Sequence, residues 1–251
     1  MGRTSEYGSH KVYRSIVGSM NWFANRTRYD ISHSLSRLSQ HLEKPTKGCM
    51  AAARRVMSYL AGTVDMTLTA DITAGDDVWD QFVDSDHAGD RKSPTGTRSH
   101  TGVITLLNGM PVMWKSNKQP VTSVSSAAAE IHALGDAVRY SNCMGYRTEE
   151  MGIHVEWPRN IMIDNASAVS FQQKTNADSR LGGTFDNRED WIVNMKDKSK
   201  VNGVKVNTIY NMSDILTKCH APATFNKLVG LVQGRHEDLS SQSAWFRGKE
   251  K

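Results

Sequence analysis

The sequence has little cysteine and lacks any long apolar run. Its three cysteines, Cys49, Cys143 and Cys219, are far apart and form no C-x-x-C pair. This spacing argues against a disulfide framework and a zinc site, and it favours a reducing compartment. The first 15 residues hold no apolar core of signal-peptide length, and no run approaches membrane-spanning length. We therefore expect an intracellular protein that does not contact a membrane.

The composition is that of a folded globular protein. The chain has 251 residues, of which 38% are hydrophobic and 23% are charged, so it can bury one or two cores. Lysine and arginine exceed the acidic residues by five, and the pI is near 9.1. This excess favours a polyanionic partner, although a basic surface without any partner fits the charge equally well.

The hydrophobic pattern changes along the chain. From Tyr13 to about Thr63 apolar residues recur at helical spacing, which predicts a helical segment. Beyond Asp71 short β-like runs replace this pattern. Two of these runs, 100–107 and 110–116, are joined by Asn108-Gly109, which predicts a hairpin.

The remaining segments alternate between helix and strand. Ser125 or Ser126 can cap a helix whose Ile131, Leu134 and Val138 share one face. After it the pattern predicts a strand over 159–164, a helix over 165–173, a strand over 203–210 and the start of a helix at 213–219. This order indicates an α/β fold in which helices cover a mixed sheet.

Four acidic residues fall at the ends or beginnings of these predicted elements: Asp84, Glu130, Asp164 and Asp214. Because sheet and helix termini converge at one edge of such folds, these residues can meet in space. Gathered carboxylates repel one another and raise one another's pKa values unless divalent cations neutralise them. Oxygen ligands in this number call for Mg²⁺ or Mn²⁺, and a pair of such ions can hydrolyse a phosphodiester.

Each acid taken alone also has a simpler explanation. An Asp at a strand end is commonly a turn residue, and a Glu near a helix N-terminus often interacts with the helix dipole. The stretch 84–95 partly matches a calcium loop, although Ala88 and Thr95 stand where ligands belong. The residues around the acids must decide between these interpretations.

Longer stretches resemble copia-type retrotransposon polyproteins. Residues 13–63 resemble the region after the polymerase domain, and residues 82–134, with their W-x-S-x-K-Q stretch, resemble the first half of the ribonuclease H domain. IMIDNASAV (161–169) and NMSDILTK (211–218) resemble its two later acidic boxes. Departures from the family are His87 in place of Trp, Ala127 and Ala128 before the A-E pair, and a faint block at 183–193 in which Asp186 matches.

This resemblance implies a ribonuclease H-like fold, with a mixed five-stranded sheet flanked by helices and preceded by a helical segment. It divides the chain into a helical remnant of the reverse-transcriptase thumb or connection (1–75), the ribonuclease H-like domain (76–220), and a C-terminal helix with a basic tail (221–251). The implied reaction is metal-dependent hydrolysis of the RNA strand of an RNA/DNA hybrid. The implied protein partner is the polymerase part of the polyprotein, in a cytoplasmic retroelement particle or the nucleus.

The resemblance also assigns roles to the four acids. It makes Asp84, Glu130, Asp164 and Asp214 the catalytic residues and the ligands of two Mg²⁺ or Mn²⁺ ions. Asp84 bridges both ions, Glu130 and Asp164 flank one, and Asp214 holds the other. The alternative function is a catalytically degenerate domain that binds nucleic acid or protein without cutting it.

The W-x-S-x-K-Q stretch suggests where the substrate binds. A basic and aromatic edge beside the acids suits contacts with phosphates and 2′-hydroxyls, and its residues are Trp114, Lys115, Lys118 and Gln119. The alternative is that Trp114 belongs to the core and the lysines are only solvated.

Overall fold

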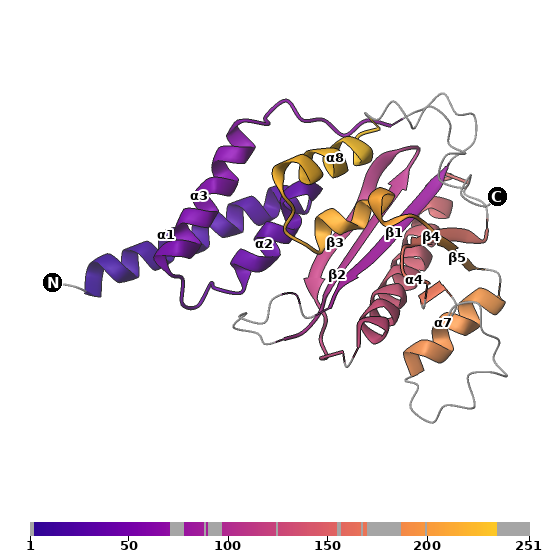
Figure 1. Cartoon of the computed structure of the whole chain (residues 1–251). Helices are drawn as coiled ribbons and strands as arrows, with labels where there is room; N and C mark the ends of the chain where they lie inside the picture. The colour runs from indigo at the N-terminus through magenta and orange to yellow at the C-terminus, as the bar shows by residue number, and fades with distance from the viewer. Residues whose placement is uncertain are drawn as a thin grey trace.

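Three helices form the N-terminal segment, as their periodicity predicts. The computed structural model describes residues 3–70, 78–87, 89, 97–123, 125–154, 157–166, 168–169, 187–198 and 200–234. The three helices are α1 (Arg3–Ala24), α2 (Ser32–Ser39) and α3 (Lys47–Ala61). Their apolar faces meet in a core that contains Tyr13, Val17 and Leu35, to one side of the sheet (Figure 1).

A five-stranded mixed sheet forms the centre of the protein, in the order β3-β2-β1-β4-β5. Its strands are β1 (Trp79–Asp86), β2 (His100–Leu107), β3 (Met110–Lys118), β4 (Arg159–Ile163) and β5 (Val201–Lys205). The first three strands are antiparallel neighbours, whereas β1, β4 and β5 run parallel. This sheet confirms the predicted ribonuclease H-like architecture.

The hairpin between β2 and β3 confirms the turn predicted from Asn108-Gly109. Asn108 has a φ of 51° and Gly109 a φ of 76°. Positive φ at both central residues is the type I′ geometry, whose twist matches that of the flanking strands. Asn108 also accepts a hydrogen bond through Oδ1 from the backbone N–H of Val78, which fixes the start of β1.

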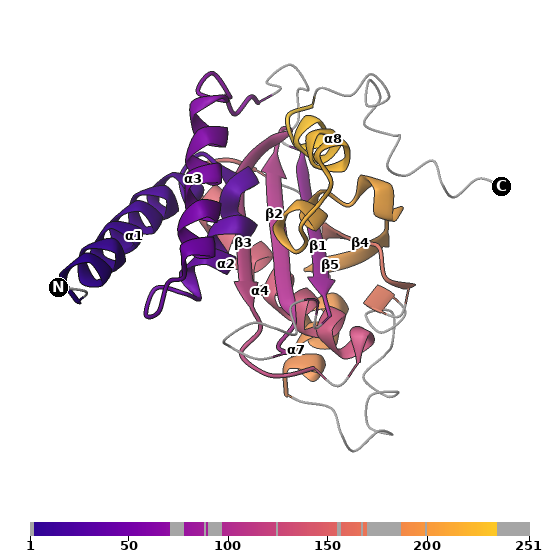
Figure 2. The same ribbon diagram turned by 60° about the vertical axis from the view of Figure 1, so that its left-hand side comes forward.

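Alternate residues of the central strands serve two cores, because successive side chains of a strand point to opposite faces. Val83, Val103 and Ile163 pack on one face against α4 (Ser126–Glu150) and α7 (Asn187–Asp197). Phe82, Ile104 and Met162 pack on the other face under the short helix η3 (Met212–Leu216) and α8 (Pro222–Val232). Figure 2 shows α8 and α4 on opposite sides of the sheet.

Two predicted elements have a different form. The strand predicted over 203–210 ends at Lys205, because Asn207 caps a 3₁₀ turn at Thr208–Tyr210 by accepting a hydrogen bond from the N–H of Ile209. The helix predicted at 213–219 is the 3₁₀ helix η3, which is capped in the same way by Asn211. The periodicity did not predict α7 at all.

Some sequence features lie outside the described residues. These are part of the helix predicted over 165–173, the candidate calcium-loop positions Ala88 and Thr95, Asp186, the domain boundary at residues 75 and 76, and the basic end at 243–251. Within the described ranges, none of the helices combines the length and apolar character required to cross a bilayer.

The N-terminal helices contact the sheet directly. Tyr29, which follows α1, is fully buried in the core under α8, and its ring meets that of Trp114 edge to face at 6.1 Å. Trp114 lies on β3 and donates a 2.6 Å hydrogen bond through Nε1 to the carbonyl of Ala24. The helical segment is therefore joined to the sheet through β3.

Candidate active site at the carboxyl edge of the sheet

Strand register places Asp84 beside Asp164. β1 and β4 run parallel, and Val83 pairs with Ile163. The next residue along the chain is an aspartate in both cases, Asp84 and Asp164. The carboxyl ends of parallel strands open at the same edge of a sheet, where ligands commonly bind. Asp84 is only 2% exposed, while Asp164 is partly buried.

A glycine lets η3 approach the same edge. Gly102 pairs with Asp84 across β1 and β2, and a Cβ at this position would lie 2.7 Å from Thr217 Cγ2 and 2.8 Å from the carbonyl oxygen of Ser213. Any side chain larger than hydrogen would therefore push η3 off the sheet. Asn211 holds η3 in place by donating a 3.1 Å hydrogen bond to the carbonyl of Val83.

Helix α4 brings Glu130 to the edge. Ser125 caps the helix by accepting a hydrogen bond from the N–H of Ala128, as predicted, so Glu130 lies in its second turn. The buried side chain of Gln119 donates a 2.8 Å hydrogen bond to the carbonyl of Ala129. This contact joins the end of β3 to the helix immediately before Glu130.

The structure brings three of the four predicted acids into one group. Asp84, Glu130 and Asp164 each offer one carboxylate oxygen, and these three oxygens lie within 4.8 Å of one another. Glu130 is 7% exposed, and its Oε2 is buried with no hydrogen-bond partner among the described residues. An orphaned buried carboxylate oxygen is costly, and a hard divalent cation is the type of partner that such a donor set fits.

The fourth acid, Asp214, is joined to this group through Lys218. The ammonium Nζ of Lys218 lies 2.7 Å from Oδ1 of Asp214 and 3.2 Å from Oδ2 of Asp84. The hydroxyl of Thr217 donates a short hydrogen bond to the same Oδ2 of Asp84. Sequence reasoning missed both residues.

The ionisation of these groups reflects their burial and proximity. Burial, followed by the charges of Asp84 and Asp164, raises the pKa of Glu130 to about 9. Burial also raises the pKa of Asp84, although Lys218 opposes this shift, and burial and Asp84 raise the pKa of Asp164. Burial alone lowers the pKa of Lys218, but Asp84 and Asp214 outweigh it and raise that pKa overall. The cluster therefore favours bound protons or cations over free carboxylates.

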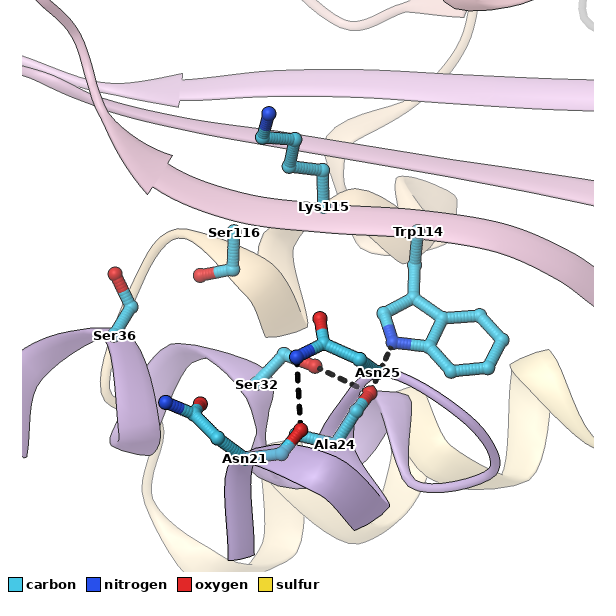
Figure 3. A pocket seen from close by; sticks show the side chains of 8 residues that line it. All are labelled: Asn21, Ala24, Asn25, Ser32, Ser36, Trp114, Lys115 and Ser116. Atoms are coloured by element: carbon cyan, nitrogen blue, oxygen red, sulfur yellow. Dashed lines mark hydrogen bonds between the residues drawn. The ribbon is translucent and has the colours of Figure 1, made fainter. Parts of the chain in front are cut away.

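The predicted substrate residues of β3 have different surroundings. The indole of Trp114 points towards the end of α1, and Figure 3 shows it beside Ala24 and Asn25 in a pocket between α1, α2 and β3. This pocket has a volume of about 290 Å³ and is lined mainly by amide and hydroxyl groups. Lys115 is exposed, with its Nζ 5.4 Å from the centre of the Tyr140 ring on α4.

A second set of basic residues borders the acids. Arg37 of α2, Arg98 and Lys118 line one small pocket together with Asp86 and Thr217, and Thr217 contacts Asp84. His100 lines the same pocket, and burial, His33, Arg37 and Lys118 lower its pKa to about 3. Arg37 carried no signal in the sequence, because the helical segment alone does not reveal that α2 packs beside β3.

Known proteins with similar sequences belong to retrotransposons. The Retrovirus-related Pol polyprotein from transposon RE2 of Arabidopsis thaliana is 31% identical over 225 residues, or 88% of this chain. That from transposon TNT 1-94 of Nicotiana tabacum is 28% identical over 206 residues, or 82% of this chain. The chain spans 15% of the length of each of these relatives.

Two further comparisons add less. No protein-family model matches the chain. Among solved structures, LC11-RNase H1 in complex with an RNA/DNA hybrid aligns over 56% of this chain and 94% of its own, with 17% identity and a TM-score of 0.39.

The chain corresponds to one region of a copia-type retrotransposon Pol polyprotein, as its motifs predict, and this region has a ribonuclease H-like fold.

Proposed function

We propose that this region is the ribonuclease H of its retroelement and hydrolyses the RNA strand of RNA/DNA hybrids with the aid of divalent cations. The observation that carries this proposal is the convergence of Asp84, Glu130 and Asp164 at the carboxyl edge of the sheet, with their oxygens within 4.8 Å of one another. The unpartnered Oε2 of buried Glu130 supports a cation at this place.

The proposed cations are Mg²⁺ or Mn²⁺, because every candidate ligand is a carboxylate oxygen. Asp84, Glu130 and Asp164 would hold one ion, and Asp84 with Asp214 would hold a second ion that accompanies the substrate. When bound, these ions supply an activated water and neutralise charge on the scissile phosphate. Thr217 fixes the Asp84 carboxylate through its short hydrogen bond to Oδ2, so that Asp84 is held in one orientation.

The proposed substrate path runs over the basic residues beside the acids. Arg37, Arg98 and Lys118 surround one pocket next to Thr217, and Lys115 lies exposed on the same strand as Lys118. Such a surface recognises phosphates, which a hybrid presents at regular intervals, without reading base sequence. In this proposal Trp114 and Gln119 support the path by holding β3 against α1 and α4.

The proposed protein partner is the remainder of the polyprotein, including its polymerase part. Helix α1 exposes large apolar side chains near its end, with Trp22 61% and Phe23 45% exposed. Exposed aromatic residues of this kind suit a protein contact. An intracellular location, in a retroelement particle or the nucleus, accords with this partner.

The experiment that tests the function is cleavage of a hybrid whose RNA strand carries a label. We expect Mg²⁺ or Mn²⁺ to support cleavage, chelator to abolish it, and Asp164→Asn to abolish it while leaving hybrid binding in chelator intact. A protein that binds the hybrid in chelator but never cuts it with either ion would instead be the degenerate binding domain.

A further inference from the structure

We propose that the ammonium group of Lys218 holds the place of the second divalent cation in the free protein, so that the site binds one ion until substrate arrives. The inference rests on the proposed metal-dependent function and deepens it. In the absence of substrate, Lys218 is a positioning residue that occupies the place of the second ion, and Asp214 binds the ammonium group of Lys218.

The geometry places Lys218 where a bridging cation belongs. Its Nζ lies between carboxylate oxygens of Asp84 and Asp214, at 3.2 and 2.7 Å. These two acids are the ones that the two-ion scheme assigns to the second ion. The same scheme assigns Glu130 and Asp164 to the first ion. Together with Asp84 they form the group of three oxygens that can share one ion.

The surrounding structure holds Lys218 close to Asp84 and Asp214. Lys218 lies two residues after the end of η3. This helix is fixed on the sheet by the hydrogen bond from Asn211 to the Val83 carbonyl and by the space that Gly102 leaves. The hydroxyl of Thr217, the preceding residue, donates to the same Oδ2 of Asp84 that Lys218 contacts. The side chain of Lys218 is 37% exposed, so its ammonium can be displaced towards solvent.

The formal charges agree with one ion in the free site. Once a bound divalent ion has displaced the proton of Glu130, four carboxylates and one ammonium carry a net charge of −3. That ion changes the charge to −1, and a second ion would change it to +1 unless the ammonium left its place. A phosphodiester brings one further negative charge, so the net charge of the site with two ions is zero once substrate is present. A second ion is therefore disfavoured until a phosphate accompanies it.

The test counts Mn²⁺ ions bound without substrate, by electron paramagnetic resonance of the free ion. The parent should bind one ion per chain. Lys218→Met keeps the length of the side chain without its charge and should bind a second ion at least tenfold more tightly than the parent does. The matched control is Lys227→Met, which changes an exposed lysine of α8 away from the acids and should leave the count at one.

A second variant keeps the test independent of the stability of Lys218→Met. Asp214→Asn should change the affinity for the first ion less than about threefold, whereas Asp164→Asn should lower it at least tenfold. Two ions in the substrate-free parent, an unchanged count in a folded Lys218→Met, or equal losses in Asp214→Asn and Asp164→Asn would overturn the inference alone. A parent that binds no ion at all would overturn the proposed function as well.

Discussion

Replacing Glu130 by Gln probes the carboxylate cluster without any substrate. The amide keeps the shape of the side chain but cannot ionise, so it removes a titratable group from a site that contains Asp84 and Asp164. In chelator we expect Glu130→Gln to be more stable than the parent at neutral pH, because the parent must keep an unpaired buried acid at this position.

The size of the effect follows from the pKa of Glu130, which burial and the neighbouring acids raise from 4.5 to about 9. At pH 7 the unfolded chain releases this proton, while the folded, metal-free chain retains it. Unfolding therefore releases a proton, and the free energy of unfolding falls as pH rises from 4.5 towards 9. At about 1.4 kcal/mol per pH unit, the cost to the parent at pH 7 is about 3 kcal/mol.

Urea denaturation in chelator at several pH values measures this difference. Glu130→Gln should match the parent at pH 4.5 and gain on it by up to about 3 kcal/mol at pH 7. The control is Glu150→Gln, at the exposed end of the same helix, which should change stability by no more than about 0.5 kcal/mol. A variant that is less stable than the parent at pH 7, or that keeps the parent's dependence on pH, refutes this reasoning.

Three further predictions concern the surroundings of the site. Arg37→Ala should weaken hybrid binding in chelator about three- to tenfold and make it less sensitive to salt, whereas Arg54→Ala on the exposed face of α3 should not; equal losses would contradict the proposed path. Trp114→Phe removes the donor to the Ala24 carbonyl and should cost about 1 kcal/mol in urea denaturation, so an unchanged midpoint would contradict the contact. Deleting residues 1–70 removes fully buried Tyr29 from the core under α8 and should lower stability by about 3–5 kcal/mol, and a truncated chain as stable as the parent would show that this contact contributes nothing.

The parts of the fold that depend on local chemistry were predictable from the sequence. Asn108-Gly109 needs positive φ at both residues and so specified its hairpin, and Ser125 specified the start of α4. Helix α7 was missed because its buried residues Ile192 and Val193 are adjacent, which leaves little helical periodicity to recognise. Short polar caps, which act within two residues, explain why β5 and η3 differ from their predicted form.

The candidate site was predictable to the extent that it follows strand and helix ends. Asp84, Glu130 and Asp164 could be predicted as candidates because each lies near the beginning or end of a predicted element. Lys218 was missed because a lysine four residues after Asp214 resembles an ordinary pair on a helix surface. Its second contact, with Asp84, depends on how η3 packs across the sheet, and no local pattern encodes that packing.

A crystal of the parent soaked in Mn²⁺, with anomalous diffraction recorded from the metal, tests the central claim most directly. The account predicts an anomalous peak within coordination distance of carboxylate oxygens from Asp84, Glu130 and Asp164, with Lys218 still between Asp84 and Asp214. A crystal with Mn²⁺ bound elsewhere, or with no peak between these three acids at saturating Mn²⁺, would contradict it.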